Sequence, residues 1–122
     1  MEKIVFLYKQ ASVPNEIIEA AEQKTPPDFE LILCEEKMSS KERRQIVSEA
    51  DYFMLYTVGF DDVDVAKKAK LMQILSAGYD RLDVHSLKSA GIPLATNGGA
   101  NAPTVAEHTI LLILALYLSL IH

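Results

Sequence analysis

The sequence predicts an α/β fold with a doubly wound, mostly parallel sheet of five strands. Two observations carry this prediction. Short apolar runs recur along the chain, and they are apolar without a break, as expected of strands that are buried on both faces. Stretches with helical features lie between these runs. Such alternation implies right-handed crossovers, and with five strands it favours the flavodoxin-like order 2-1-3-4-5.

The first half of the chain supplies three strands and two helices. Pro14 and Asn15 open the first helix, and Pro26-Pro27 prevents its continuation. Ser39 or Ser40 can cap a second helix that runs to Glu49. All five strands are expected at residues 4–8, 29–34, 52–57, 71–75 and 92–96.

Two charged clusters have simple structural interpretations. The charged residues at 41–44 are interpreted as a solvated helix face. Asp61, Asp62 and Asp64 resemble metal ligands, but the Gly and the bidentate Glu of a calcium loop are missing. We therefore interpret these aspartates as residues that start a helix over 63–69, and no metal site is predicted.

The second half predicts a helix over Asp83–Ala90 with Gly91 as its C′ residue. The chain then ends in an almost entirely apolar stretch, Thr109–Ile121, which predicts a long apolar C-terminal helix. Its thirteen residues fall short of the roughly twenty that a membrane span needs. A helix that is apolar all round must be buried all round, so we expect a fragment, an oligomer such as a homodimer, or both.

Composition excludes some classes of function. The net charge is −5 and no basic stripe is present, so nucleic acid is not an expected partner, and neither is a membrane. The single cysteine, Cys34, lies in an apolar run and is interpreted as a buried core thiol. Because the N-terminus lacks the features of a signal peptide, a cytoplasmic location is expected.

Glycine-bearing turns follow three of the strands and would gather at the carboxyl edge of the sheet, where such folds bind ligands. They are Val58-Gly59, Ala77-Gly78 and Asn97-Gly98. Backbone amides beside Gly78 could hold a small anion, and Asn101 could add a side-chain amide. An ordinary strand-to-helix turn with a helix cap explains the same residues equally well.

No complete catalytic motif is present, so no catalytic residue is assigned. The sequence has no Gly-x-Gly-x-x-Gly, no Walker loop, no His-Glu-x-x-His and no Cys pair for zinc. His85 is expected to be exposed. His108 follows Glu107, and neighbours on a helix point in different directions, so the two are poorly aimed for joint chemistry.

The combination of Ser76-Ala-Gly-Tyr-Asp-Arg-Leu-Asp83, Ala90-Gly-Ile-Pro-Leu-Ala-Thr-Asn97 and Asn101-Ala-Pro-Thr-Val-Ala-Glu-His108 resembles the N-terminal substrate-binding domain of the D-isomer-specific 2-hydroxyacid dehydrogenases. The resemblance implies a flavodoxin-like domain into which a Rossmann domain is inserted. It implies an oxidoreductase that interconverts a 2-keto acid and a D-2-hydroxy acid with NAD or NADP.

By position, the resemblance also assigns roles. Ala77 and Gly78 would bind the substrate carboxylate through backbone amides, and Ala77 would also lie near the nicotinamide. Asn101 would contact substrate, and the Val58-Gly59 loop would close over it. Thr104 and Val105 would face the cofactor at the domain cleft.

The resemblance divides the chain into a flavodoxin-like substrate-binding domain, residues 1–103, and the start of a long interdomain or oligomerisation helix, residues 104–122. The family's catalytic arginine, glutamate and histidine, and its dinucleotide loop, would follow that helix. We therefore expect this chain alone to be inactive. The alternative is a free-standing flavodoxin-like module that binds an anion or self-associates without catalysis.

Overall fold

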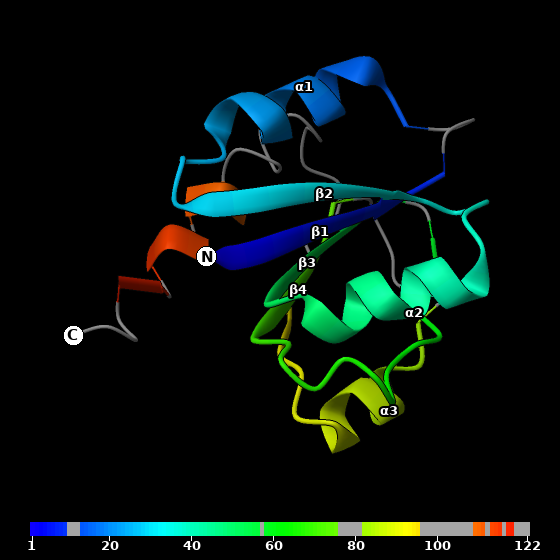
Figure 1. The fold of residues 1–122 in the computed structure, drawn as a ribbon. Helices are drawn as coiled ribbons and strands as arrows, with labels where there is room; N and C mark the ends of the chain where they lie inside the picture. The colour runs from blue at the N-terminus through cyan, green and yellow to red at the C-terminus, as the bar shows by residue number, and fades with distance from the viewer. Residues whose placement is uncertain are drawn as a thin grey trace.

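A computed structural model describes residues 1–9, 13–56, 58–75, 82–95, 109–111, 113–115 and 117–118. Its centre is a five-stranded sheet in which all neighbouring strands are parallel (Figure 1). The strand order is β2-β1-β3-β4-β5, which confirms the predicted order. The strands are β1 (Glu2–Tyr8), β2 (Phe29–Glu35), β3 (Tyr52–Tyr56), β4 (Leu71–Ile74) and β5 (Leu94–Ala95).

The sheet is buried on both faces, as the unbroken apolar runs predict. In β1, which lies between β2 and β3, Val5 pairs with Ile32 on one side and with Phe53 on the other. Successive β1 side chains point to opposite faces, so Ile4 and Val5, both fully buried, belong to two different core clusters. One core therefore forms on each face of the sheet.

Helices cover both faces in the described part of the chain. Helix α1 (Asn15–Lys24) lies on one face, and α2 (Ser40–Glu49) and α3 (Val84–Ser89) lie on the other (Figure 1). Two predicted helix starts are confirmed, because the side chains of Ser39 and Asp83 accept hydrogen bonds from backbone N–H groups of the first turn. The predicted C′ residue is confirmed as well, since Gly91 has a φ of +75°.

The predicted helix over residues 63–69 is wrong. The connection between β3 and β4 consists of isolated turns, with bonds such as Val65 N–H to the Asp62 carbonyl at 3.1 Å. Its aspartates do not cap a helix, because the side chain of Asp62 pairs with Arg43 and Arg44 of α2. The interpretation of residues 41–44 as a solvated face is therefore wrong for Arg43, whose side chain is 26% exposed, whereas the Arg44 side chain is 41% exposed.

The fifth strand is shorter than predicted. The sequence places its start at Ile92, but the Ile92 N–H bonds to the Leu87 carbonyl at 3.0 Å and closes the end of α3. This bond completes the turn around Gly91, so strand pairing begins only at Leu94. Thr96 lies outside the described residues.

The described residues between 109 and 118 are helical, but a continuous long apolar helix is not shown. Ile110 and Ile113 are buried in the same core cluster as Ile17 of α1. In contrast, Leu111 is 63% exposed and Leu118 is 49% exposed. The C-terminal segment is therefore not buried on all sides within the described residues. The predicted domain boundary between residues 103 and 104 lies outside the described residues.

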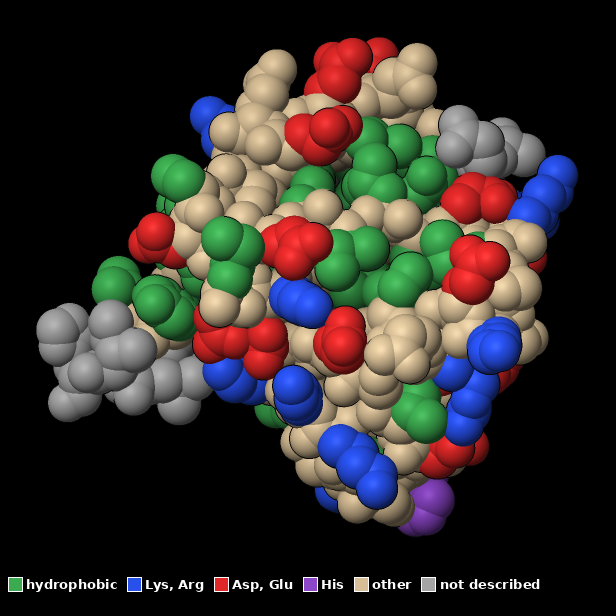
Figure 2. All heavy atoms as spheres, viewed as in Figure 1, with side chains coloured by type: hydrophobic (Ala, Val, Ile, Leu, Met, Phe, Trp, Pro, Cys, Tyr) green, Lys and Arg blue, Asp and Glu red, His purple; other side chains and the backbone are tan. Residues whose placement is uncertain are grey.

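Charges of both signs lie over the surface. On the face that Figure 2 shows, Lys and Arg side chains are interspersed with Asp and Glu side chains. Within the described ranges, no helix has the length and apolar character needed to cross a membrane.

Candidate functional site

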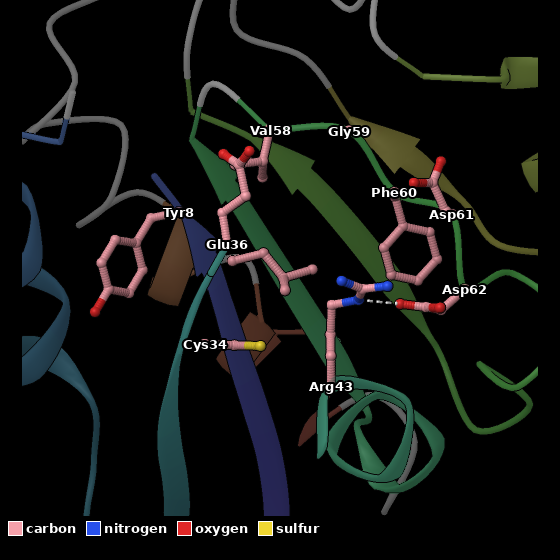
Figure 3. Close-up of a pocket in the computed structure, with 10 residues that line it drawn as sticks. Tyr8, Cys34, Glu36, Arg43, Val58, Gly59, Phe60, Asp61 and Asp62 are labelled. Atoms are coloured by element: carbon pink, nitrogen blue, oxygen red, sulfur yellow. Dashed lines mark hydrogen bonds and ion pairs between the residues drawn. The ribbon is translucent and has the colours of Figure 1, made fainter. Parts of the chain in front are cut away.

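A pocket of about 210 Å³ lies at the carboxyl edge of the sheet, where the first three strands end (Figure 3). Parallel α/β sheets bind ligands at this edge. The lining residues come from the ends of β1 and β2, from the residue after β2, from α2 and from the segment after β3. They are Leu7, Tyr8, Cys34, Glu36, Arg43, Val58, Gly59, Phe60, Asp61 and Asp62.

Val58 and Gly59 lie on the pocket wall, at the sheet edge where the sequence predicts them. Val58 is half-buried, and Gly59 is exposed. Phe60 is buried next to them, with its ring centroid 5.1 Å from that of Phe53 in β3. This ring contact holds the segment against the sheet, and the role of Val58 and Gly59 in binding substrate stays a prediction.

An ion-pair cluster closes one side of the pocket. Asp62 is only 3% exposed, and its Oδ2 accepts a hydrogen bond from Arg43 Nε at 2.7 Å (Figure 3). Its Oδ1 accepts from an Nη of Arg44 at 3.3 Å. The hydrogen bond with Asp62 raises the pKa of Arg43, so this guanidinium stays charged.

The prediction that Cys34 is a buried core thiol is confirmed, since its side chain is fully buried. Its Sγ lies 3.8 Å from Met38 Sδ. Burial raises the pKa of the Cys34 thiol, which disfavours the reactive thiolate. The cysteine therefore serves as an apolar part of the pocket floor.

Sequence reasoning missed Arg43 as a pocket residue. Its position one turn into α2, among other charged residues, is typical of a solvated helix face. The sequence signal that could have found Arg43 is the opposite charge of Asp62. Arg43 lies in the connection from β2 to β3 and Asp62 in the connection from β3 to β4, and consecutive connections of a parallel sheet can meet on one face. Glu36, directly after β2, was missed as well.

The other predicted site residues lie outside the described residues. The structure therefore does not test whether these residues come together at one site. They are Ala77, Gly78, Asn101, Thr104 and Val105. His108 lies there too, whereas His85 is described and is exposed, as predicted. Among the described residues, no three His, Cys, Asp or Glu side chains form a group that could hold a metal ion.

The described pocket does not fit the pyrophosphate of a dinucleotide. It contributes three carboxylates, from Glu36, Asp61 and Asp62, and one guanidinium, from Arg43, which is already paired. Such a lining repels a pyrophosphate, which proteins hold with helix N-termini and free donors. A nicotinamide cofactor would therefore have to be held by residues other than these.

Comparisons with known proteins agree with this fold. Hydroxypyruvate reductase of Thermotoga maritima is 32% identical over 89 residues, which cover 70% of this chain and 29% of that protein. NAD+-bound 3-phosphoglycerate dehydrogenase of Entamoeba histolytica has a similar structure, with a TM-score of 0.65 at 14% identity over 79% of this chain and 33% of that one. A D-lactate dehydrogenase of Treponema pallidum matches with a TM-score of 0.60 at 20% identity over 79% of this chain and 29% of that one.

The chain thus spans about a third or less of the length of these relatives. The family model described as D-isomer specific 2-hydroxyacid dehydrogenase, catalytic domain, matches residues 5–115. That match begins inside β1 and ends at Ala115, before the helical residues 117–118. Because it covers most of the sequence, this chain belongs to the D-isomer specific 2-hydroxyacid dehydrogenase family and corresponds to its catalytic domain.

Proposed function

We propose that this chain is the substrate-binding part of an NAD- or NADP-dependent oxidoreductase that interconverts a 2-keto acid and a D-2-hydroxy acid. The family match over residues 5–115 carries the proposal. The pocket at the carboxyl edge, with Gly59 exposed on its wall, supports it, because small ligands of parallel α/β proteins bind at this edge.

In this proposal, backbone amides hold the substrate carboxylate. The guanidinium at the described pocket is engaged by Asp62, and the remaining charged groups there are carboxylates. A carboxylate ligand therefore depends on N–H donors, which Gly59, Ala77 and Gly78 supply. Asn101 adds a side-chain amide that can donate to the substrate.

The cofactor contacts of this chain are assigned to Ala77, Thr104 and Val105. NAD or NADP would supply the hydride when bound. The 122 residues contain no Gly-x-Gly-x-x-Gly loop, and their matches cover 29% and 33% of the curated and structural relatives compared first. We therefore propose that the chain alone does not turn over substrate.

A homodimer and a cytoplasmic location complete the proposal. Leu111 and Leu118 are both exposed, and their spacing of seven residues would place them on one side of a continuous helix. Covering them with a second copy would bury this apolar surface. Light scattering of the chain should show a dimer that becomes monomeric when Leu111 and Leu118 are both changed to Glu, and a monomeric wild type would contradict the homodimer.

An NMR titration of the ¹⁵N-labelled chain tests carboxylate binding. Oxalate serves as the ligand because it presents the carboxylate and adjacent oxygen of a 2-keto acid. We expect saturable shifts of the amides of Gly59, Ala77 and Gly78, and none at Gly91, which lies at the end of α3. Sodium chloride at equal ionic strength is the control, and unshifted amides at Gly59, Ala77 and Gly78 would overturn the proposed binding mode.

A second assay tests the inactivity of the chain. The purified 122 residues are incubated with NADH or NADPH and a panel of 2-keto acids, and absorbance at the nicotinamide band is followed. No oxidation above the protein-free blank is expected. Oxidation that depends on the keto acid and on the chain would disprove this part of the proposal.

A further inference from the structure

We propose that Arg43 and Asp62 form a positioning pair that holds the Val58-Gly59 backbone in the geometry that receives substrate. The inference rests on the proposed function, since it assigns a purpose to the segment next to the proposed carboxylate site. Neither residue is a catalytic residue. Both act through the backbone of the segment 58–62, whose residues all line the pocket.

The pair has the features of a strong interaction. The Asp62 side chain is 5% exposed and the Arg43 side chain 26% exposed, and only 2.7 Å separates Oδ2 from Nε. Charge-assisted hydrogen bonds in such partly desolvated places are stronger than neutral ones. Loss of Arg43 would leave the buried Asp62 carboxylate with the longer bond from Arg44 at 3.3 Å, and removing one partner of a buried pair is destabilising.

Arg44 extends this attachment over the next turn. Its guanidinium donates to Asp62 Oδ1 at 3.3 Å and to the two oxygens of Asp64 at 3.1 and 2.7 Å. The Asp64 side chain is 65% exposed, however, and exposed ion pairs contribute little. Asp62 is thus the main attachment point of the segment to α2, and Asp64 offers a matched control.

Asp62 is attached close enough to Gly59 in the chain to determine the position of the Gly59 backbone. Three residues span at most about 11 Å of extended chain, so a displacement of Asp62 reaches Gly59 directly. Between them, Phe60 packs on Phe53 of the sheet and Asp61 is exposed. The segment is therefore fixed to β3 through Phe60 and to α2 through Asp62.

Helix α2 provides a rigid base for this attachment. Val47 is fully buried against the sheet, and Ser39 caps the first turn with its side chain. Figure 3 shows the Arg43 side chain reaching from α2 across the pocket toward Asp62, with its guanidinium near Phe60. The guanidinium therefore spans the space between helix and segment, and its removal would leave the segment held by the packing of Phe60 and by the longer bond from Arg44 to Asp62 at 3.3 Å.

The test uses the full 122-residue chain and compares Asp62→Asn and Arg43→Lys with two control variants. Arg43→Lys keeps the charge but removes the planar donor group. The controls are Asp64→Asn, which removes the exposed pair, and Glu49→Gln, which removes the exposed Lys3–Glu49 pair. Each variant is measured for its oxalate dissociation constant at Gly59, for ¹⁵N heteronuclear NOEs of Val58 and Gly59, and for its melting temperature.

We expect Asp62→Asn and Arg43→Lys to weaken oxalate binding by about tenfold, in the range of coupling between contacting residues. Their NOEs at Val58 and Gly59 should fall, while both controls stay within about twofold of wild type, as exposed pairs predict. If Asp62→Asn does not fold, Arg43→Lys decides the result.

The outcomes separate this inference from the proposed function. Wild type without oxalate shifts would overturn the carboxylate site and the positioning role together. Wild type that binds, with Asp62→Asn and Arg43→Lys binding equally well, would overturn the positioning role alone. The positioning role is likewise overturned if binding falls in parallel with melting temperature across all four variants, because the pair would then be merely structural.

Discussion

The carboxylate of Asp51 accepts a hydrogen bond from the backbone N–H of Lys3, with 2.9 Å between Oδ2 and N. The backbone of Asp51 also donates to the Lys3 carbonyl at 3.0 Å and accepts from the Lys70 N–H at 2.7 Å. One residue thus connects the amino ends of β1, β3 and β4. The pocket lies at the opposite, carboxyl ends of β1 and β3, so Asp51 supports the alignment of these two strands from their amino ends.

Replacing Asp51 by Ala should lower the free energy of unfolding by about 1–3 kcal/mol, because the Lys3 N–H loses its acceptor in a half-buried place. Asp51→Asn is the matched control, since its side-chain oxygen can still accept this bond. Burial raises the pKa of Asp51, which indicates that its charge is not itself favoured there. Urea unfolding measures both variants, and equal losses for Asn and Ala would show that the charge matters more than the acceptor.

Tyr52 should make the fold sensitive to alkali. Its hydroxyl is buried and has no hydrogen-bond partner among the described residues, and burial raises the pKa of Tyr52 from 10 to about 12. A folded-state pKa above the unfolded one gives stability that is complete below pH 10 and is lost as the pH rises from 10 through about 12. Unfolding measured at pH 8, 10 and 11.5 should show this decline.

Tyr52→Phe serves as the control for this effect. It removes an unpartnered buried hydroxyl, so the free energy of unfolding at neutral pH should rise by about 1 kcal/mol. The alkaline decline should become shallower in the same variant. A destabilised Phe variant would mean that the hydroxyl has a partner after all.

The fold was largely predictable from sequence because its signals are local. Unbroken apolar runs such as Ile4–Tyr8 are typical of strands buried on both faces, and Gly91 lies where a helix needs a left-handed residue. The error at residues 63–69 has a different origin. Aspartates are common at helix starts, and only the approach of Arg43 and Arg44 from another element makes Asp62 an ion-pair partner instead.

The candidate site was predictable to a smaller extent for the same reason. Val58 and Gly59 follow directly from the end of a strand, so the sequence locates them at the pocket. Arg43 reaches the same pocket only through the packing of α2 beside the segment after β3. No spacing rule within a helix carries that information, because the partner lies in a different crossover connection.

The stability that the Asp83 cap gives to α3 should be lost in acid. Hydrogen bonds from the Ser86 hydroxyl at 2.7 Å and the Ser86 N–H at 3.1 Å hold the pKa of Asp83 below its usual 3.8. A lowered folded-state pKa gives stability that is present above 3.8 and is lost as the pH falls through the folded value. The carboxyl ¹³C shift of Asp83 should therefore titrate below the usual 3.8. In Asp83→Asn the acid loss should shrink, and an unchanged acid profile would contradict this role.

Gly91→Ala should destabilise the fold through backbone strain alone. The φ of Gly91 is +75°, and a Cβ built there meets no atom within 4 Å, so no clash adds to the cost. The left-handed conformation costs an L-residue about 1–2 kcal/mol, and the free energy of unfolding should fall by that amount. Gly91→Asn should cost less than Gly91→Ala, since asparagine tolerates this conformation better. Denaturant unfolding of the three proteins measures the order Gly, Asn, Ala, and an Ala variant as stable as wild type would show that α3 ends in a different turn from the one that closes on Ile92.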